Sequence, residues 1–277
     1  MRALIGRVVG IMARLRRNSP RGRLKEPILR ARFIVFMLGV CFLRFSLYAG
    51  PPFHTDDPEP VELYHWEFYC ASQMTGSQDG ISGTAPHFEI NYGIFPEMQI
   101  HIIVPLSSSH PRTGNSAYGP GDVELGLKYR FVNETSSMPQ VGVFPLLEIP
   151  TGNAEKGLGS GNAQVFIPLW LQKSWGQWTT YGGGGCLVTI TPDPLNSWFV
   201  GWEGQRDFSE FITIGAEVFG TIIPTKSSEN EAAFTIGATV NFNDNHHVLF
   251  SVGRDFAGPN DLFLYAAYQL TIGQGSK

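Results

Sequence analysis

The chain has 277 residues and a formal net charge of −4, and that length permits one or two domains. Of its 20 basic and 24 acidic residues, eleven basic and one acidic fall within residues 1–49, which leaves nine basic and 23 acidic residues for the remainder. A body this acidic lacks the basic footprint that nucleic-acid binding needs, so we predict no nucleic-acid partner.

The first 49 residues have the layout of a secretory signal peptide. An arginine-rich stretch leads into the eleven apolar residues FIVFMLGVCFL (33–43), which are too few to span a bilayer as a helix. We predict that residues 1–49 are a signal peptide with a long basic region, that Ala49 is its last residue and that the protein is exported. A basic tail followed by a short membrane-surface segment is the alternative interpretation.

From residue 50 onward the chain alternates polar and apolar residues and shows no sustained helical period. No run of 18 consecutive apolar residues occurs there, so the sequence predicts no transmembrane helix. Twelve segments carry the period of two that is typical of β-strands. They cover residues 62–74, 83–95, 97–106, 120–132, 139–150, 163–175, 177–190, 197–207, 211–222, 231–243, 246–255 and 261–272.

The connections between these segments alternate in length. SSSHPRTGNSAYGP (107–120) and TGNAEKGLGSGN (151–162) are long and rich in Gly, Ser and Asn, whereas the turns near FPEM and SWGQW are short. An antiparallel meander in the bacterial outer membrane has this signature, because short turns face the periplasm and longer loops face outside. An even number of strands also places both chain ends on one side.

The segment GDVELGLKYRFV (121–132) has one charged face and one apolar face. In a water-soluble sandwich the apolar face would pack on a core, whereas in a membrane barrel it would meet lipid. The segments run to about ten to fourteen residues, against five or six for soluble strands and about 9–11 for a strand that crosses a bilayer. We therefore predict that residues 50–277 form an all-β fold, an antiparallel up-and-down transmembrane β-barrel of about 12 strands.

A barrel of this kind turns the polar face of each strand toward an enclosed lumen. In a wet lumen, an excess of carboxylates favours cations or neutral solutes over anions. In a lumen whose charges are cross-paired, the same groups close a narrow barrel. The candidate lumen-facing residues are His65, Glu67, His87, Glu89, His101, Asp122, Glu124, Lys128, Arg130, Glu148, Glu203 and Glu217.

Two H-x-E pairs, His65/Glu67 and His87/Glu89, can each share one face, because residues i and i+2 of a strand point the same way. A metal site would need three or four such groups to converge, with His101 as a further candidate. A charged, hydrogen-bonded lumenal network is the alternative interpretation. We adopt it and predict no metal and no cofactor.

The sequence offers no nucleophile motif. No G-x-S-x-G elbow occurs, and GLGSGN (157–162) is not a P-loop because no G-K-[ST] follows it. The glycines of YGGGG (181–185) lie within a predicted strand, where a bend or a close backbone approach explains them. We predict that the protein is not an enzyme, and a barrel hydrolase is the weakest of the three functional alternatives.

Several segments resemble a known family. They are HWEFYCASQ (65–73), GTAPHFEINYG (83–93), GDVELGLKYRFV (121–132), the stretch PLLEIPTGN to TTYGGGG (145–185), and the stretch from QRDFSE to NHHVLFSVGR (205–254). The chain resembles the MetA-pathway phenol-degradation family of bacterial outer-membrane barrels, whose members are often called transporters. The resemblance covers nearly everything after residue 50. It implies an outer-membrane location, a link to aromatic catabolism and transport.

One feature departs from this family. Such barrels usually end on an aromatic residue that the barrel-assembly machinery recognises, whereas this chain has Ile272 at the corresponding place and five further residues. The resemblance still implies that machinery as a partner, together with outer-membrane lipid.

These observations predict a porin-like channel in the outer membrane. Small-molecule solutes, including aromatic or hydrophobic compounds, would diffuse through a polar, acidic lumen that the loops 107–120 or 151–162 constrict. The alternative from another class is a structural or adhesion barrel whose lumen is sealed by ion pairs.

Overall fold

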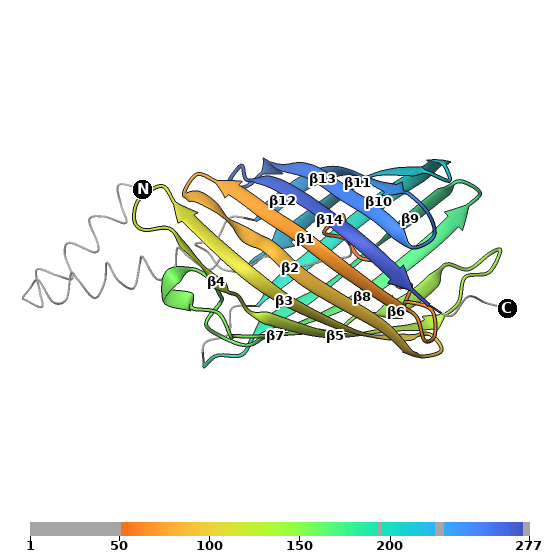
Figure 1. Ribbon diagram of the computed structural model, residues 1–277, viewed down its shortest axis with the longest axis horizontal. Coiled ribbons are helices and arrows are strands. Elements are labelled where there is room, and N and C mark those ends of the chain that lie inside the picture. Colours follow the sequence, from red (N-terminus) through yellow and green to blue (C-terminus); the bar gives the residue numbers. More distant parts are fainter. Residues whose placement is uncertain (1–50, 193–195, 225–229, 274–277) are drawn as a thin grey trace, which may run out of the picture. The chain divides into compact units, whose positions relative to one another are not determined.

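The computed structural model describes residues 51–192, 196–224 and 230–273 (Figure 1). The predicted signal peptide, residues 1–49, lies outside the described residues and stays a prediction. Within the described ranges, no helix is long and apolar enough to cross a membrane. One short 3-10 helix, η1 (Ala154–Lys156), stands among the strands.

The rest of the fold is built from antiparallel strands. They are β1 (Trp66–Ser77), β2 (Gly80–Phe95), β3 (Met98–Pro111), β4 (Ala117–Pro120), β5 (Val123–Val132), β6 (Gln140–Val143), β7 (Leu146–Ile149), β8 (Gln164–Trp175), β9 (Trp178–Thr189), β10 (Ser197–Ser209), β11 (Ile212–Ile222), β12 (Glu231–Asn241), β13 (His246–Ala257) and β14 (Leu262–Ile272).

The sheet closes on itself. Consecutive strands pair with one another, and the first pairs with the last, so that Trp66 of β1 stands opposite Ile272 of β14. β4 and β5 both pair with β3, and β6 and β7 both lie between β5 and β8, so each of these two pairs is one interrupted barrel strand. The result is a closed antiparallel barrel of twelve strands, as the sequence predicts.

The two interruptions have local causes. Pro145, between β6 and β7, has no N–H to donate to the ladder, although its carbonyl oxygen still accepts from Leu127 N on β5 (3.1 Å). Gly121 and Asp122 separate β4 from β5. Gly121 N still donates to the Pro105 carbonyl oxygen (3.0 Å), but Pro105 has no N–H to return the bond, and the register shifts by one residue before Glu124 pairs with Ile103.

The strand boundaries follow the predicted ones to within a few residues, with two notable differences. β1 begins four residues later than predicted, because the chain turns at Tyr64, whose φ of 63° is left-handed and cannot continue a strand. β3 runs on to Pro111 and pairs with β4. Most of the predicted loop 107–120 is therefore barrel wall, and the expectation that it folds inward as a constriction is wrong.

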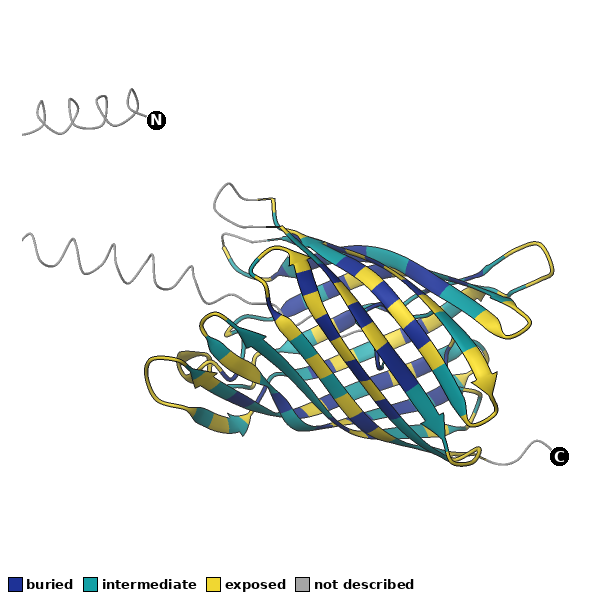
Figure 2. Cartoon of the chain, turned by 90° about the horizontal axis from the view of Figure 1, so that it is seen from above, coloured by how far each residue is buried: buried dark blue, intermediate teal, exposed yellow. Residues whose placement is uncertain are grey.

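The apolar side chains of the wall point outward. On β5, Leu125, Leu127 and Tyr129 are exposed, whereas Glu124 and Lys128 are buried. Figure 2 shows the same alternation of exposed and buried residues along the other strands. This inside-out pattern is that of a transmembrane barrel, in which lipid covers the apolar face.

The glycine run within β9 permits close approach between strands. Gly183 has a φ of 153°, and a Cβ at this position would clash with the carbonyl oxygen of Leu169 on β8. Gly182 leaves room for the ring of Trp202 on β10, since a Cβ there would also overlap that ring. The run is a packing feature of the wall, as the sequence predicts.

Candidate functional site: the barrel lumen

Residues 51–62, here called the N-terminal segment, lie inside the barrel and not in its wall. Pro52 accepts a hydrogen bond through its carbonyl oxygen from Ser251 Oγ on β13 (2.5 Å). At the other end of the segment, Val61 N donates to Gln99 Oε1 on β3 (2.8 Å). Because β13 and β3 are separated by other strands in the closed sheet, a segment that binds both of them occupies the lumen between them.

The segment also has a defined position along the barrel axis. Its first residues bind Ser251 and Glu217, each the sixth residue of its strand and therefore near mid-barrel. Glu59 binds Gln140 and Gln172, which lie close to the barrel end where β1 begins. The segment thus descends from the middle of the lumen to that end before the chain enters the wall.

Glu217 on β11 anchors the upper part of the segment. Its Oε1 accepts from His54 N (2.8 Å) and faces His54 Nδ1 (3.2 Å), while its Oε2 accepts from Thr55 N (2.8 Å). The Glu217 side chain is fully buried. Hydrogen bonds to backbone N–H groups compensate a carboxylate for the loss of water, and they fix the position of the segment.

Lys128 on β5 anchors the middle of the segment. Its Nζ lies 2.9 Å from Asp56 Oδ1 and 3.4 Å from Asp57 Oδ1, and it stands over the ring of Phe144 at 4.9 Å from the centroid. Lys128 and Asp56 are both buried. A buried ion pair is costly to break, because removing one partner leaves the other charge uncompensated.

A cavity of about 340 Å³ remains beside the segment. Six of the twelve candidate lumen residues line it, namely Glu67, His87, Glu89, His101, Glu124 and Lys128. The N-terminal segment adds four carboxylates to the same wall, those of Asp56, Asp57, Glu59 and Glu62, so the cavity is strongly acidic. Because sequence patterns do not place an irregular segment in the lumen, these four carboxylates were not among the predicted site residues.

The lining residues of β2, β3 and β5 form one hydrogen-bonded network. Asn91 donates to Glu89 Oε1 (2.8 Å) and accepts from Gln99 Nε2 (2.9 Å). The two ring nitrogens of His101 lie 2.6 Å from Asn91 Oδ1 and 3.1 Å from Glu124 Oε1. In the part of the chain that the structure describes, no three His, Cys, Asp or Glu side chains are placed to hold a metal ion.

Three further candidates, His65, Arg130 and Asp122, lie near the barrel ends. His65 Nδ1 faces the carbonyl oxygen of Leu63 (3.1 Å), so of the first H-x-E pair only Glu67 reaches the cavity that His87 and Glu89 line. Arg130 binds Glu97 through Nε (2.5 Å) and Gln140 through Nη1 (2.7 Å).

Asp122 holds the loop 151–162 at the start of β5. It accepts hydrogen bonds from Gly152 N (2.7 Å), Ser160 N (2.5 Å) and Ser160 Oγ (2.9 Å). The loop is thereby tethered to the wall at this end of the barrel.

The last three candidates, Glu148, Glu203 and Glu217, each stand opposite another carboxylate in the register. Glu148 is half-buried and stands directly opposite Glu124. Glu203 stands opposite Glu217 and is completely buried, and neither of its carboxylate oxygens has a hydrogen-bond partner among the described residues.

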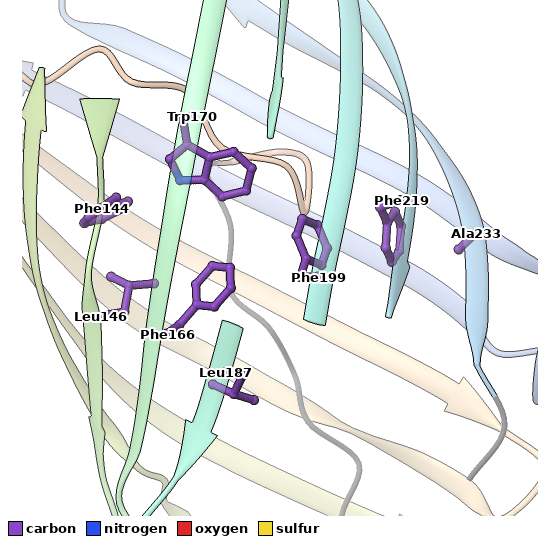
Figure 3. Close-up of a cluster of buried hydrophobic side chains, with 8 residues drawn as sticks. All are labelled: Phe144, Leu146, Phe166, Trp170, Leu187, Phe199, Phe219 and Ala233. Carbon is purple, nitrogen blue, oxygen red and sulfur yellow. The ribbon is translucent and has the colours of Figure 1, made fainter. Parts of the chain in front are cut away.

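A cluster of buried apolar side chains, mostly aromatic, also lies in the lumen, and the sequence did not predict it. Two of its members, Phe144 and Leu146, line the acidic cavity as well. Figure 3 shows its members, the buried residues Phe144, Leu146, Phe166, Trp170, Leu187, Phe199, Phe219 and Ala233. Phe166 and Trp170 share the inward face of β8 with Gln164 and Gln172. Alternate residues of a strand share one face, so the inward position of Gln164 and Gln172 also predicts that Phe166 and Trp170 point inward.

The family assignment rests on a match to most of this barrel. The family profile described as "Putative MetA-pathway of phenol degradation" matches residues 90–271. The chain belongs to this family. The matched range begins within β2, so the N-terminal segment precedes the part that the family profile covers.

Solved structures resemble the barrel of this family member in fold. An outer-membrane channel from Pseudomonas putida F1 has a TM-score of 0.65 and 15% identity, with 78% of this chain and 98% of that chain covered. The translocator domain of the autotransporter NalP from Neisseria meningitidis has a TM-score of 0.54 and 9% identity, with 87% and 97% covered. The KdgM porin has a TM-score of 0.53 and 9% identity, with 74% and 98% covered. Among curated proteins, no sequence matches the chain.

Proposed function

We propose that the protein is an outer-membrane channel through which small solutes, including aromatic or hydrophobic compounds, diffuse. The observation that carries this proposal is a closed barrel with an apolar exterior and an internal polar cavity of about 340 Å³. Membership of a phenol-degradation family supports aromatic compounds among the solutes. The barrel-assembly machinery stays a predicted partner.

Solute would follow a path with two chemically different walls. One wall carries the acidic network around Glu89 and Glu124, and the other carries the aromatic side chains around Phe199 and Trp170. The N-terminal segment stands between these walls and narrows the path. Passage through the lumen therefore depends on where this segment lies, which makes it the constriction in place of the predicted loop 107–120.

Planar-bilayer recordings of the purified protein test the proposal. We expect stepwise conductance with a preference for cations, because carboxylates outnumber cationic groups on the cavity wall. A bilayer that stays silent over the whole voltage range, with protein shown to be inserted, would contradict the channel.

The selectivity itself depends on lumenal carboxylates. Replacing Glu124 and Glu148 together by Gln should lower the cation preference, measured as a smaller reversal potential in a salt gradient. Glu210→Gln, in the exposed turn between β10 and β11, is the matched control and should leave the reversal potential unchanged. Equal reversal potentials for the double variant and the wild type would refute the assignment of these two residues to the pore.

A sealed structural barrel is the second candidate, and the position of the N-terminal segment favours it. Ion pairs from Lys128 to Asp56 and Asp57 hold the N-terminal segment across the lumen, as a barrel sealed by ion pairs requires. The two candidates differ in their conductance, because a sealed barrel stays silent with its segment in place.

We also propose that the protein has no catalytic activity. The residues that line the cavity include no Ser, Thr or Cys as a nucleophile. If any hydrolysis is detected, its loss in a folded His87→Asn or His101→Asn variant would argue for catalysis in the lumen. Full retention of the hydrolysis in both variants would exclude either histidine as the base.

A further inference from the structure

The N-terminal segment, and not a strand, supplies two aromatic rings to the barrel interior, those of Phe53 and His54. The imidazole of His54 stacks on Phe219 of β11, with ring centroids 4.3 Å apart and an interplanar angle of 20°. Phe263 of β14 meets the same imidazole edge-on at 5.2 Å and 72°. The third contact is polar, since Nδ1 of His54 lies 3.2 Å from Glu217 Oε1.

The groups that receive this ring belong to the wall. Phe219 and Glu217 are neighbours on the inward face of β11, and Phe219 and Phe263 are themselves in contact, with centroids 5.7 Å apart. We call Phe219, Phe263 and Glu217 the aromatic cradle. It combines a flat face, an edge and a carboxylate acceptor, and regular strands hold all three groups in place.

The cradle also borders a hydrogen-bond acceptor that none of the described residues uses. Glu203 is directly opposite Glu217 in the register and is completely buried, and both of its oxygens lack a hydrogen-bond partner among the described residues. Buried polar groups are normally satisfied, so Glu203 is a further acceptor beside the cradle for a donor that enters when the N-terminal segment is displaced.

We propose that the aromatic cradle is a binding site for a small, uncharged aromatic ring that bears a hydrogen-bond donor, such as a phenol or an aromatic amine. The ligand takes the place of the His54 imidazole, stacks on Phe219 and donates its O–H or N–H to Glu217. This inference rests on the proposed channel and names the solute class that the channel recognises.

The chemistry of the cradle sets its selectivity. An aromatic carboxylate would place its negative charge beside Glu217, which is unfavourable in a buried site. An aromatic hydrocarbon without a donor would keep the stacking and lose the hydrogen bond. The expected order of affinity is therefore phenol above toluene, with benzoate weakest.

Ligand binding and the N-terminal segment compete for the cradle. A ring in the cradle displaces His54, and with it the hydrogen bonds that hold His54 N and Thr55 N to Glu217. A ligand that binds one of two states shifts the population toward that state. The solute thus loosens the upper part of the segment that narrows its own path.

The test uses the purified, processed protein in detergent and fluorine NMR of 4-fluorophenol, with 4-fluorotoluene and 4-fluorobenzoate as comparison ligands. We expect 4-fluorophenol to bind wild type, and Phe219→Ala to weaken that binding by about three- to tenfold, the value of one lost aromatic contact. His54→Ala should tighten it by a similar factor, because the internal competitor is gone. His110→Ala, an exposed histidine at the barrel end, is the matched control and should not change it.

Folding of every variant is checked by its heat-modifiable mobility in gel electrophoresis, and Phe263→Ala replaces Phe219→Ala if the latter fails to fold. Unchanged affinity in His54→Ala, or equal affinity for 4-fluorophenol and 4-fluorobenzoate, would overturn the proposal. Conductance without 4-fluorophenol binding removes the cradle and leaves the channel standing. Binding with a silent bilayer removes the channel and leaves the cradle standing.

Discussion

At the scale of single residues, Lys128 links the wall of the barrel to the N-terminal segment inside it. It is buried, its partners Asp56 and Asp57 come from the N-terminal segment, and more than 70 residues separate them in the sequence. The sequence predicts that Lys128 faces inward, because its parity on β5 matches that of Glu124. The sequence does not predict its partners, because an irregular segment has no period that fixes where its side chains point.

We expect Lys128→Met to release the segment and leave the barrel intact. Loss of one partner from a buried ion pair costs about 3–5 kcal/mol, and detachment of a segment that belongs to no sheet relieves that cost. The measurements are protease cleavage within residues 51–62, which should become faster, and heat-modifiable gel mobility, which should not change. Lys173→Met is the matched control, because Lys173 pairs with Glu134 (2.9 Å) away from the segment. Equal cleavage rates for both variants would contradict the role of Lys128 as an anchor.

At the scale of elements, the wall could be predicted from the sequence and the filling of the lumen could not. Period-two alternation and the alternating loop lengths depend on neighbouring residues alone, and they were enough to place twelve strands. The same alternation also predicts that the aromatic side chains Phe166 and Trp170 of β8 point inward. The contact of His54 with Phe219, by contrast, joins residues on separate elements whose approach depends on barrel closure.

We expect deletion of residues 51–60 to enlarge the channel and leave the wall complete. The strand pairings from β1 to β14 involve none of these residues, so the barrel should still form. Single-channel conductance should rise, and its cation preference should persist because Glu89 and Glu124 remain. The matched control replaces residues 51–60 by a Gly/Ser sequence of the same length, which keeps the chain and removes its anchors. A conductance equal to that of the wild type would contradict the position of the segment in the solute path.

At the scale of the whole molecule, the inside-out distribution of side chains should make the exterior intolerant of charge. Val218 lies near the middle of β11 on the exposed face, between Trp202 of β10 and Phe234 of β12. Arginine at the midplane of a lipid-facing strand costs about 2–4 kcal/mol, and near the interface it costs about 0–1 kcal/mol. We therefore expect Val218→Arg to lower the free energy of unfolding in lipid vesicles by the larger amount, measured by urea titration of tryptophan fluorescence. Tyr118→Arg, in the short strand β4 at the barrel end, should be nearly neutral. If both arginines cost the same, or if Val218→Arg stabilises the protein, the exposed face of this barrel does not contact hydrocarbon.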